Sequence, residues 1–119
     1  MKLETKNLIV DLTFDFALDI VEFCEVLESK RKFNVANQLF RSGTSIGANV
    51  FESQHEESKV DFIHKLKISS KESNETKYWL LLCKHSKSYP DTDELLKKLD
   101  SIQKILTKII TTTKSQIIK

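Results

Sequence analysis

Residues that interrupt regular structure are scarce in this chain. Its 119 residues include 2 glycines and 1 proline, too few for the many turns of a β-sandwich, so long helices with short connections are favoured. No run of about 18 apolar residues occurs, so we expect no segment that spans a membrane. The N-terminal residues Met-Lys-Leu-Glu-Thr-Lys-Asn lack the apolar core of a signal peptide. A cytoplasmic protein is therefore expected.

Cysteine and unbalanced charge are also scarce. Cys24 and Cys83 form no Cys-x-x-Cys pair, which argues against a zinc or thioredoxin-like site and predicts two small buried side chains. The net charge of +2 points to no particular partner. The halves differ, however: residues 1–60 carry 7 basic and 10 acidic side chains, and residues 61–119 carry 12 and 7. We therefore expect a basic face in the second half.

Apolar residues recur at helical spacing along four segments of the chain. After a short tail at 1–10, the predicted helices cover about residues 11–29, 34–54, 59–86 and 92–113. Four amphipathic helices joined by short loops predict an all-α protein. The expected architecture is an antiparallel, up-down-up-down four-helix bundle that forms one domain over residues 1–119.

Polar residues at three helix starts predict N-caps. Asn34 is the expected cap of the second helix. Ser58 with Asp61, and Asp91 with Glu94, resemble the capping boxes of the third and fourth helices.

The two glycines, Gly43 and Gly47, lie four residues apart within the predicted second helix. Each lowers helix stability by about 1 kcal/mol relative to alanine. Close approach of a neighbouring helix offsets such a loss. Because the third helix has small residues at Ser69, Ser70 and Ser73, we expect the glycines to lie at a contact with that helix.

The third helix is apolar almost all round between Tyr78 and Cys83. A helix with this pattern is buried on more than one side. Because a four-helix monomer buries only one side of each helix, the pattern predicts an oligomer. Trp79 and its apolar neighbours are expected to lie between subunits.

Three stretches of the chain resemble one protein family. They are Leu39-Phe-Arg-Ser-Gly-Thr-Ser-Ile-Gly-Ala-Asn-Val-Phe-Glu52, Ser58-Lys-Val-Asp-Phe-Ile-His-Lys-Leu-Lys-Ile68 and Glu72-Ser-Asn-Glu-Thr-Lys-Tyr-Trp-Leu80. The family consists of bacterial four-helix bundles whose founding members are encoded in intervening sequences of 23S ribosomal RNA genes. The resemblance covers about residues 8–110. Phe51 is a departure, because relatives often have alanine there.

The resemblance implies a small cytoplasmic bundle that assembles into a ring-shaped homopentamer. It also implies kinship with the accessory protein of diversity-generating retroelements, a basic pentamer that works with a reverse transcriptase and nucleic acid. Most members of the family have no established activity, so the resemblance names no reaction and no cofactor.

Arg41 lies inside the predicted second helix, one turn before Ser45. By height along antiparallel helices its partners are Glu72 and Glu75, which predicts an ion pair that fixes the register of two helices. The alternative is an anion site formed by Arg41 with Ser42 and Ser45. The sequence leaves both interpretations open.

Two segments, Glu52-Ser-Gln-His55 and Asp61-Phe-Ile-His64, have the ligand spacing of di-iron bundles. Both flank one loop at an end of the bundle, whereas a di-iron site lies at its middle. We therefore expect no metal site, and His55, His64 and His85 are expected at the surface. No nucleophile shares a helical face with a histidine base, so we predict no catalytic residue and no cofactor.

Lysines are frequent in the third and fourth helices, where they are candidates for contacts with nucleic-acid backbone. The candidates are Lys65, Lys67, Lys71, Lys84, Lys97, Lys104 and Lys108. In a ring each lysine recurs in every subunit, which strengthens the positive field. An acidic stripe in the first helix, formed by Asp15, Asp19 and Glu22, opposes this field.

These patterns give one main hypothesis and two alternatives. The main hypothesis is a non-enzymatic bundle that forms a homopentameric ring and binds RNA or DNA without sequence preference. The first alternative is a scaffolding oligomer with an unidentified protein partner and no nucleic-acid role, and the second is a metal-dependent enzyme. The residues expected to act at helix contacts are Arg41, Gly43, Gly47, Glu72, Glu75 and Trp79.

Overall fold

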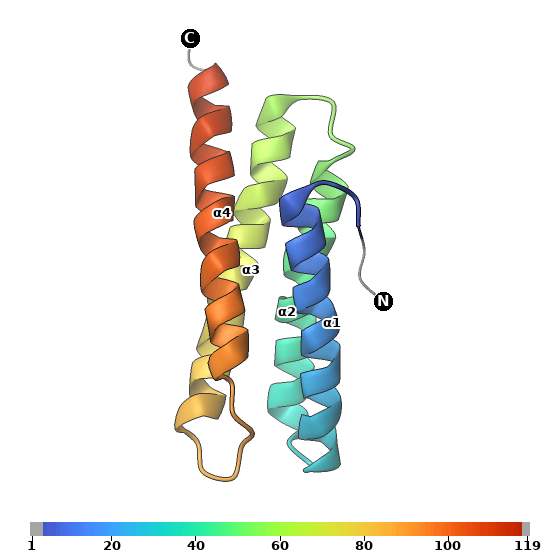
Figure 1. Ribbon diagram of the computed structural model, residues 1–119, viewed down its shortest axis with the longest axis vertical. Coiled ribbons are helices and arrows are strands. Elements are labelled where there is room, and N and C mark those ends of the chain that lie inside the picture. Colours follow the sequence, from blue (N-terminus) through green and yellow to red (C-terminus); the bar gives the residue numbers. More distant parts are fainter. Residues whose placement is uncertain (1–3, 118–119) are drawn as a thin grey trace.

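Four long helices form all the regular structure of residues 4–117, the part of the chain that the computed structural model describes. They are α1 (Leu8–Ser29), α2 (Phe33–Ser53), α3 (Lys59–His85) and α4 (Asp93–Ile117). Each helix runs antiparallel to the one before it, in an elongated bundle of 52 × 28 × 20 Å (Figure 1). The predicted all-α, up-down-up-down architecture is confirmed.

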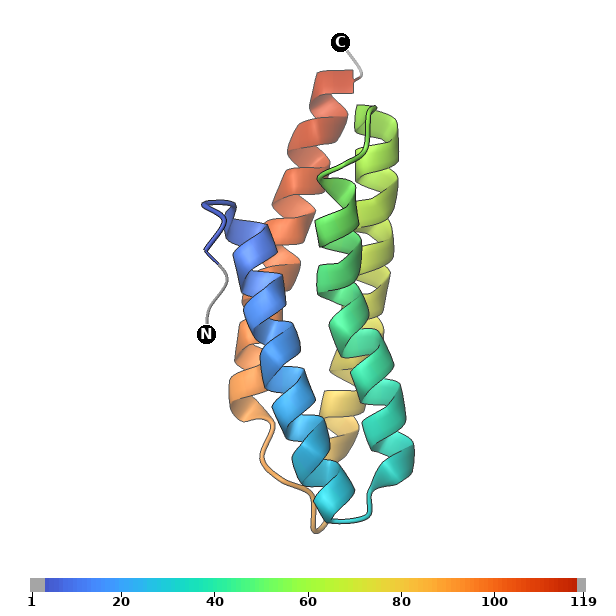
Figure 2. The same cartoon turned by 90° about the vertical axis from the view of Figure 1, so that its right-hand side faces the viewer.

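The core is a column of aliphatic side chains contributed by all four helices. Burying one such side chain stabilises the fold by about 1.5–3 kcal/mol. Contacts are most extensive between α2 and its neighbours α1 and α3, and least extensive between α1 and α4 (Figure 2). Residues that are almost fully buried include Ile20, Leu27, Leu39, Ile46, Leu66, Leu80, Leu99 and Leu106.

Gly43 and Gly47 allow α2 to come close to α1. A Cβ atom on Gly43 would lie 2.9 Å from both Cγ atoms of Ile20, and one on Gly47 would lie 3.0 Å from the carbonyl oxygen of Thr13. The prediction that the glycines contact α3 is therefore wrong. Both α1 and α3 border α2, and the spacing of the glycines does not tell these neighbours apart.

The α3 helix approaches α2 through hydroxyl groups instead. Ser69 Oγ donates a hydrogen bond of 2.8 Å to the carbonyl oxygen of Ile46. Thr76 Oγ1 lies 3.0 Å from Ser42 Oγ, and both side chains are buried. The middle of α2 therefore has small residues on both sides, glycines toward α1 and Ser42 toward α3.

The turn between α1 and α2 is tight and contains no glycine. Arg31 adopts a left-handed conformation with φ of 62°, and the Lys32 N–H bonds back to the Leu27 carbonyl at 2.8 Å. The chain enters α2 directly at Phe33, with Lys32 at the N-cap position and no side-chain cap. The predicted Asn34 cap is wrong, because Asn34 already lies within the first turn of α2.

Of the N-caps predicted for α3 and α4, one is confirmed and the other is wrong. Ser58 caps α3 as predicted, since its Oγ accepts a hydrogen bond from the Asp61 N–H at 3.0 Å. At α4, Asp91 Oδ1 accepts from the Asp93 N–H at 3.3 Å. The predicted pairing of Asp91 with Glu94 is wrong, because α4 begins at Asp93, one residue later than predicted.

A single chain leaves apolar side chains of α3 uncovered. Tyr78 is 58% exposed, and Leu81 and Leu82 are 37% and 39% exposed. The Trp79 indole is half-buried beside Tyr78, with ring centroids 5.2 Å apart. We call Tyr78, Trp79, Leu81 and Leu82 the α3 stripe. It is the surface that the sequence predicts to lie between subunits.

Candidate functional site

Two segments without acidic residues lie side by side where α3 begins and α4 ends. They are residues 62–71 of α3 and 101–117 of α4. Gln103 joins the two helices, since its Nε2 donates to Ser73 Oγ at 3.0 Å and to Asn74 Oδ1 at 2.9 Å. We call the surface that these segments form the lysine end. Its lysines are Lys67, Lys71, Lys104, Lys108 and Lys114.

Lys67 and Lys114 approach each other across the two helices of the lysine end. The Lys114 ammonium lowers the pKa of Lys67, because two like charges held close together disfavour the charged form. An anion placed between them would relieve this repulsion. The pair is thus suited to bind a phosphate oxygen.

The seven lysines predicted from the sequence do not form one surface. Lys67, Lys71, Lys104 and Lys108 belong to the lysine end, although Lys104 also pairs with Asp100 at 3.0 Å on the exposed face of α4. Lys65 lies in the acid-free segment of α3 but turns toward α2. There its Nζ is 3.1 Å from Glu52 Oε1.

Lys84 and Lys97 lie at the opposite end of the α3–α4 pair. Lys84 Nζ is 3.3 Å from Asp93 Oδ1. Asp91 and Glu94 belong to the same end of the bundle. Local carboxylates therefore reduce the positive potential around these two lysines.

Lys114 was missed by sequence reasoning, because it follows a run of threonines at which the helical pattern weakens. In the structure α4 continues to Ile117. Ile109, Ile110 and Thr113 stay half-buried along its inner face. Ile117, four residues after Thr113, continues this spacing and is the signal that would have extended the helix past Lys114.

The acidic stripe of α1 faces a different lysine. Asp15, Asp19 and Glu22 line a groove of about 380 Å³ between α1 and α4. Lys98 Nζ lies 2.6 Å from Asp19 Oδ2, and this hydrogen bond raises the pKa of Lys98. The acidic stripe of α1 is thus paired with Lys98, which lies outside the lysine end.

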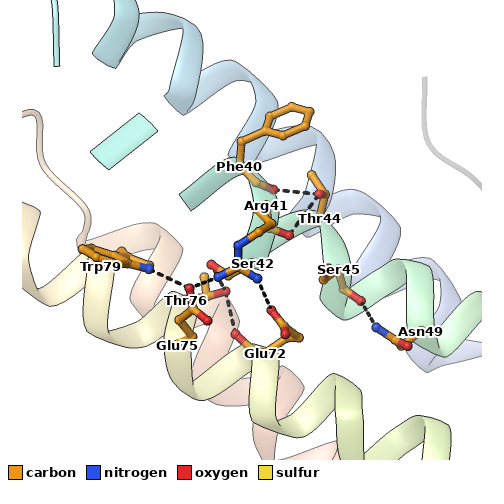
Figure 3. Close-up of polar contacts among 10 residues, drawn as sticks. All are labelled: Phe40, Arg41, Ser42, Thr44, Ser45, Asn49, Glu72, Glu75, Thr76 and Trp79. Atoms are coloured by element: carbon orange, nitrogen blue, oxygen red, sulfur yellow. Dashed lines mark hydrogen bonds and ion pairs between the residues drawn. The ribbon is translucent and has the colours of Figure 1, made fainter. Parts of the chain in front are cut away.

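Arg41 joins α2 to α3 through two carboxylates (Figure 3). Its Nη1 lies 3.2 Å from Glu72 Oε2, and its Nη2 donates to Glu75 Oε2. Trp79 Nε1 donates to the same Glu75 oxygen at 3.0 Å. The indole N–H and the Arg41 guanidinium both favour the ionised carboxylate, so the pKa of Glu75 is lowered.

The Ser42 hydroxyl, next to Arg41 in the sequence, has another partner. It is buried and lies 3.0 Å from Thr76 Oγ1. Glu72 and Glu75 take up the guanidinium instead. This geometry is that of the structural ion pair, one of the two interpretations that the sequence left open.

Within residues 4–117, no three His, Cys, Asp or Glu side chains gather closely enough to hold a metal ion. His55, His64 and His85 are exposed. Burial raises the pKa of both the Cys24 and Cys83 thiols to about 11, which keeps them protonated and weakly nucleophilic at neutral pH. No helix in the described part of the chain is long and apolar enough to cross a bilayer.

Comparison with known proteins identifies the family. The family model of the 23S rRNA-intervening sequence protein matches residues 5–108. The chain belongs to this family. The resemblance of the α2 and α3 sequences is thereby confirmed.

A solved structure of similar fold belongs to a protein of unknown function from the S23 ribosomal protein family of Bacteroides thetaiotaomicron VPI-5482. It is 38% identical to this chain, with a TM-score of 0.81 over 86% of this chain and 97% of that chain. Comparison with curated proteins gives no match. These comparisons assign the chain a family and a fold, and they name no activity.

Proposed function

We propose that this protein is a non-enzymatic, self-associating bundle that binds the backbone of RNA or DNA through its lysine end. The observation that carries the proposal is the meeting of two acid-free segments, which places five lysines on adjoining helices. Lysine ammonium groups bind phosphates whatever the base sequence. Self-association into a homopentameric ring, which the family resemblance implies, would repeat the lysine end in every copy and strengthen binding.

The side chains around the lysine end favour backbone contact over base readout. Thr107 and Thr111 are its exposed neighbours on α4, and His64 lies nearby on α3. Bidentate readout of bases relies on arginine, asparagine or glutamine side chains reaching a groove. The amides of Gln103 and Asn74 are bonded to each other, which leaves Gln116 as the exposed amide near the end of α4. We therefore expect weak sequence preference and strong salt dependence.

Fluorescence anisotropy with a mixed-sequence RNA and a DNA of equal length tests the proposal. The variant replaces Lys67, Lys71 and Lys108 with glutamine. We expect the slope of log affinity against log salt to fall by about 2–3, because roughly one counterion is released per phosphate contact. A matched control replaces Lys84, Lys87 and Lys97 at the opposite end, which removes the same charge, and should bind nearly as the wild type does.

Two results would overturn nucleic-acid binding through the lysine end. The first is the absence of binding to either nucleic acid at tens of micromolar protein in low salt. The second is an equal loss in both triple variants, which would show that only net charge matters.

A scaffolding oligomer without a nucleic-acid role is the second candidate function. The exposed apolar surface of α1, α2 and α3 favours it, since such surfaces mark protein contacts. Under this function, light scattering gives a mass above that of one 13.8 kDa chain, while neither nucleic acid binds.

A further inference from the structure

An apolar groove runs along the outer side of α1 and α2. Its largest part has a volume of about 440 Å³, with Gly47, Ala17 and Ala48 among its lining residues. Phe14 and Phe51, which are 39% and 51% exposed, also line it. Because the small residues add little bulk between the two rings, the groove is open to a side chain from outside.

The groove continues along the contact between the two helices in both directions. Toward the α1–α2 turn, Phe40 borders a hollow of about 280 Å³ that also includes Glu28. Toward the start of α1, Phe51 borders a further hollow of about 210 Å³. Apolar surface is thus exposed along much of the α1–α2 pair, where water contact is unfavourable.

The α3 stripe is a second apolar surface, on another side of the molecule. Figure 3 shows Phe40 directed away from Glu72 and Glu75 and therefore away from the side where Trp79 lies. Tyr78 is 58% exposed, which makes it the most exposed member of the stripe. No single copy covers both surfaces with its own side chains in residues 4–117.

The charges beside the two surfaces are opposite in sign. Exposed Glu28 of α1 and Glu52 of α2 line the hollows of the groove, where Glu52 is paired with Lys65. Beside the α3 stripe, Glu72 and Glu75 are paired with Arg41, and the exposed Lys71 and Lys77 of α3 add positive charge. Residues 1–60 are net acidic and residues 61–119 net basic, so the same complementarity extends over the two halves of the chain.

We propose that the α1–α2 groove receives the α3 stripe of a second copy of this chain. The contact joins two different surfaces, so in a pair of copies one keeps its stripe free and the other keeps its groove free, and both can bind further copies. Such a head-to-tail contact covers both apolar surfaces at once and pairs the acidic side of one copy with the basic side of the next. This inference rests on the self-association in the proposed function and names the surfaces that produce it.

Two variants of the full chain block the two surfaces separately. Phe51→Glu places a charge in the groove, and Leu82→Glu places one on the α3 stripe. Both positions are exposed and glutamate is a good helix former, so we expect each variant to keep wild-type helicity by circular dichroism. Where a glutamate variant loses helicity, serine at the same position replaces it. Ser101→Glu, on exposed α4, is the matched control for added charge.

Light scattering gives the mass of each variant and so shows whether the contact between copies forms. We expect the wild type and Ser101→Glu to exceed 13.8 kDa, and each blocked variant to be a monomer of that mass. An equimolar mixture of Phe51→Glu and Leu82→Glu should form a 1:1 complex of two chains. It should grow no further, because its one intact groove and one intact stripe meet each other.

The other outcomes overturn the inference in distinguishable ways. A wild type that is monomeric at tens of micromolar removes self-association from the proposed function as well. If both variants keep the wild-type mass, or if only the groove variant becomes a monomer, the head-to-tail contact is wrong while self-association stands. Nucleic-acid binding is measured separately by anisotropy and does not depend on these results.

Discussion

Ile20 and Gly43 meet where α1 and α2 come closest, and this pair shows why glycine occupies a helix interior. Gly43→Ala raises intrinsic helix stability by about 1 kcal/mol. The new Cβ would, however, lie 2.9 Å from both Cγ atoms of the fully buried Ile20. Overpacking of this kind destabilises by about 1–3 kcal/mol. We therefore expect a net loss of up to about 2 kcal/mol in the free energy of unfolding, measured by chemical denaturation.

Measuring Gly43→Ala in an Ile20→Ala variant separates the effect of packing from that of helix propensity on the free energy of unfolding. Ile20→Ala removes both Cγ atoms and is itself destabilising by about 2–5 kcal/mol. In that background Gly43→Ala should gain up to about 1 kcal/mol, because only the propensity term remains. The same sign of effect in both backgrounds would show that the close approach is not what selects glycine.

Glu75 gives the Arg41 ion pair a defined pH dependence. The Trp79 N–H and Arg41 lower its pKa in the folded protein from an ordinary value of 4.5. A lowered pKa contributes stability above the ordinary value, and this contribution is lost as the pH falls through the folded-state value. The contribution should be below about 1 kcal/mol, because the Glu75 side chain is 35% exposed and screened by solvent.

The comparison of wild type with Glu75→Gln checks this pH dependence. We expect the difference in unfolding free energy to be largest at neutral pH and to shrink below pH 4.5. Glu25→Gln, which removes an exposed carboxylate outside the ion pair, is the control for loss of one negative charge. A difference that grows in acid would contradict the lowered pKa.

At the scale of the helices, periodicity predicted which elements form and what each buries. Leu39 and Ile46, placed by their spacing on the inner face of α2, are fully buried. Spacing did not predict which neighbour each side of α2 meets, because the glycines and Ser42 are all small residues of one helix. Nor did it predict the turn at Arg31, because its left-handed conformation is normally signalled by glycine.

The α1–α4 contact is the least extensive of the bundle, and it contains one poorly accommodated carboxylate. Asp15 Oδ1 is buried without a hydrogen-bond partner in residues 4–117. Leu12, Phe16 and Ile102 line the same groove. Because an unpaired buried polar atom is unfavourable by about 1–3 kcal/mol, we expect Asp15→Leu to stabilise the protein by about 1 kcal/mol in thermal or chemical unfolding.

Asp19→Leu is the matched control for this substitution. It adds the same apolar side chain to the groove but removes the partner that lies 2.6 Å from Lys98 Nζ. We expect a smaller gain or none. Equal gains from both variants would mean that added apolar area, and not relief of the unpaired Asp15 oxygen, explains the effect.

At the scale of the whole molecule, the fold determines which charged side chains lie close together, whereas composition gives only their number. Composition predicted a basic second half but did not predict where its lysines gather. Antiparallel packing brings residues 62–71 beside residues 101–117, and it leaves Lys84 and Lys97 among carboxylates at the opposite end. The site was therefore only partly predictable, because distance along the chain does not give distance in space.

The even number of antiparallel helices has a practical consequence for experiments. The start of α1 and the end of α4 point to the same end of the bundle, whereas the loop between α3 and α4 lies at the other (Figure 1). A fluorescent domain fused after α4 would thus be tethered close to Lys114. We expect this fusion to weaken nucleic-acid binding in anisotropy measurements, and a domain inserted between Lys87 and Ser88 to leave it intact. Equal affinities for the two fusions would place the binding surface elsewhere.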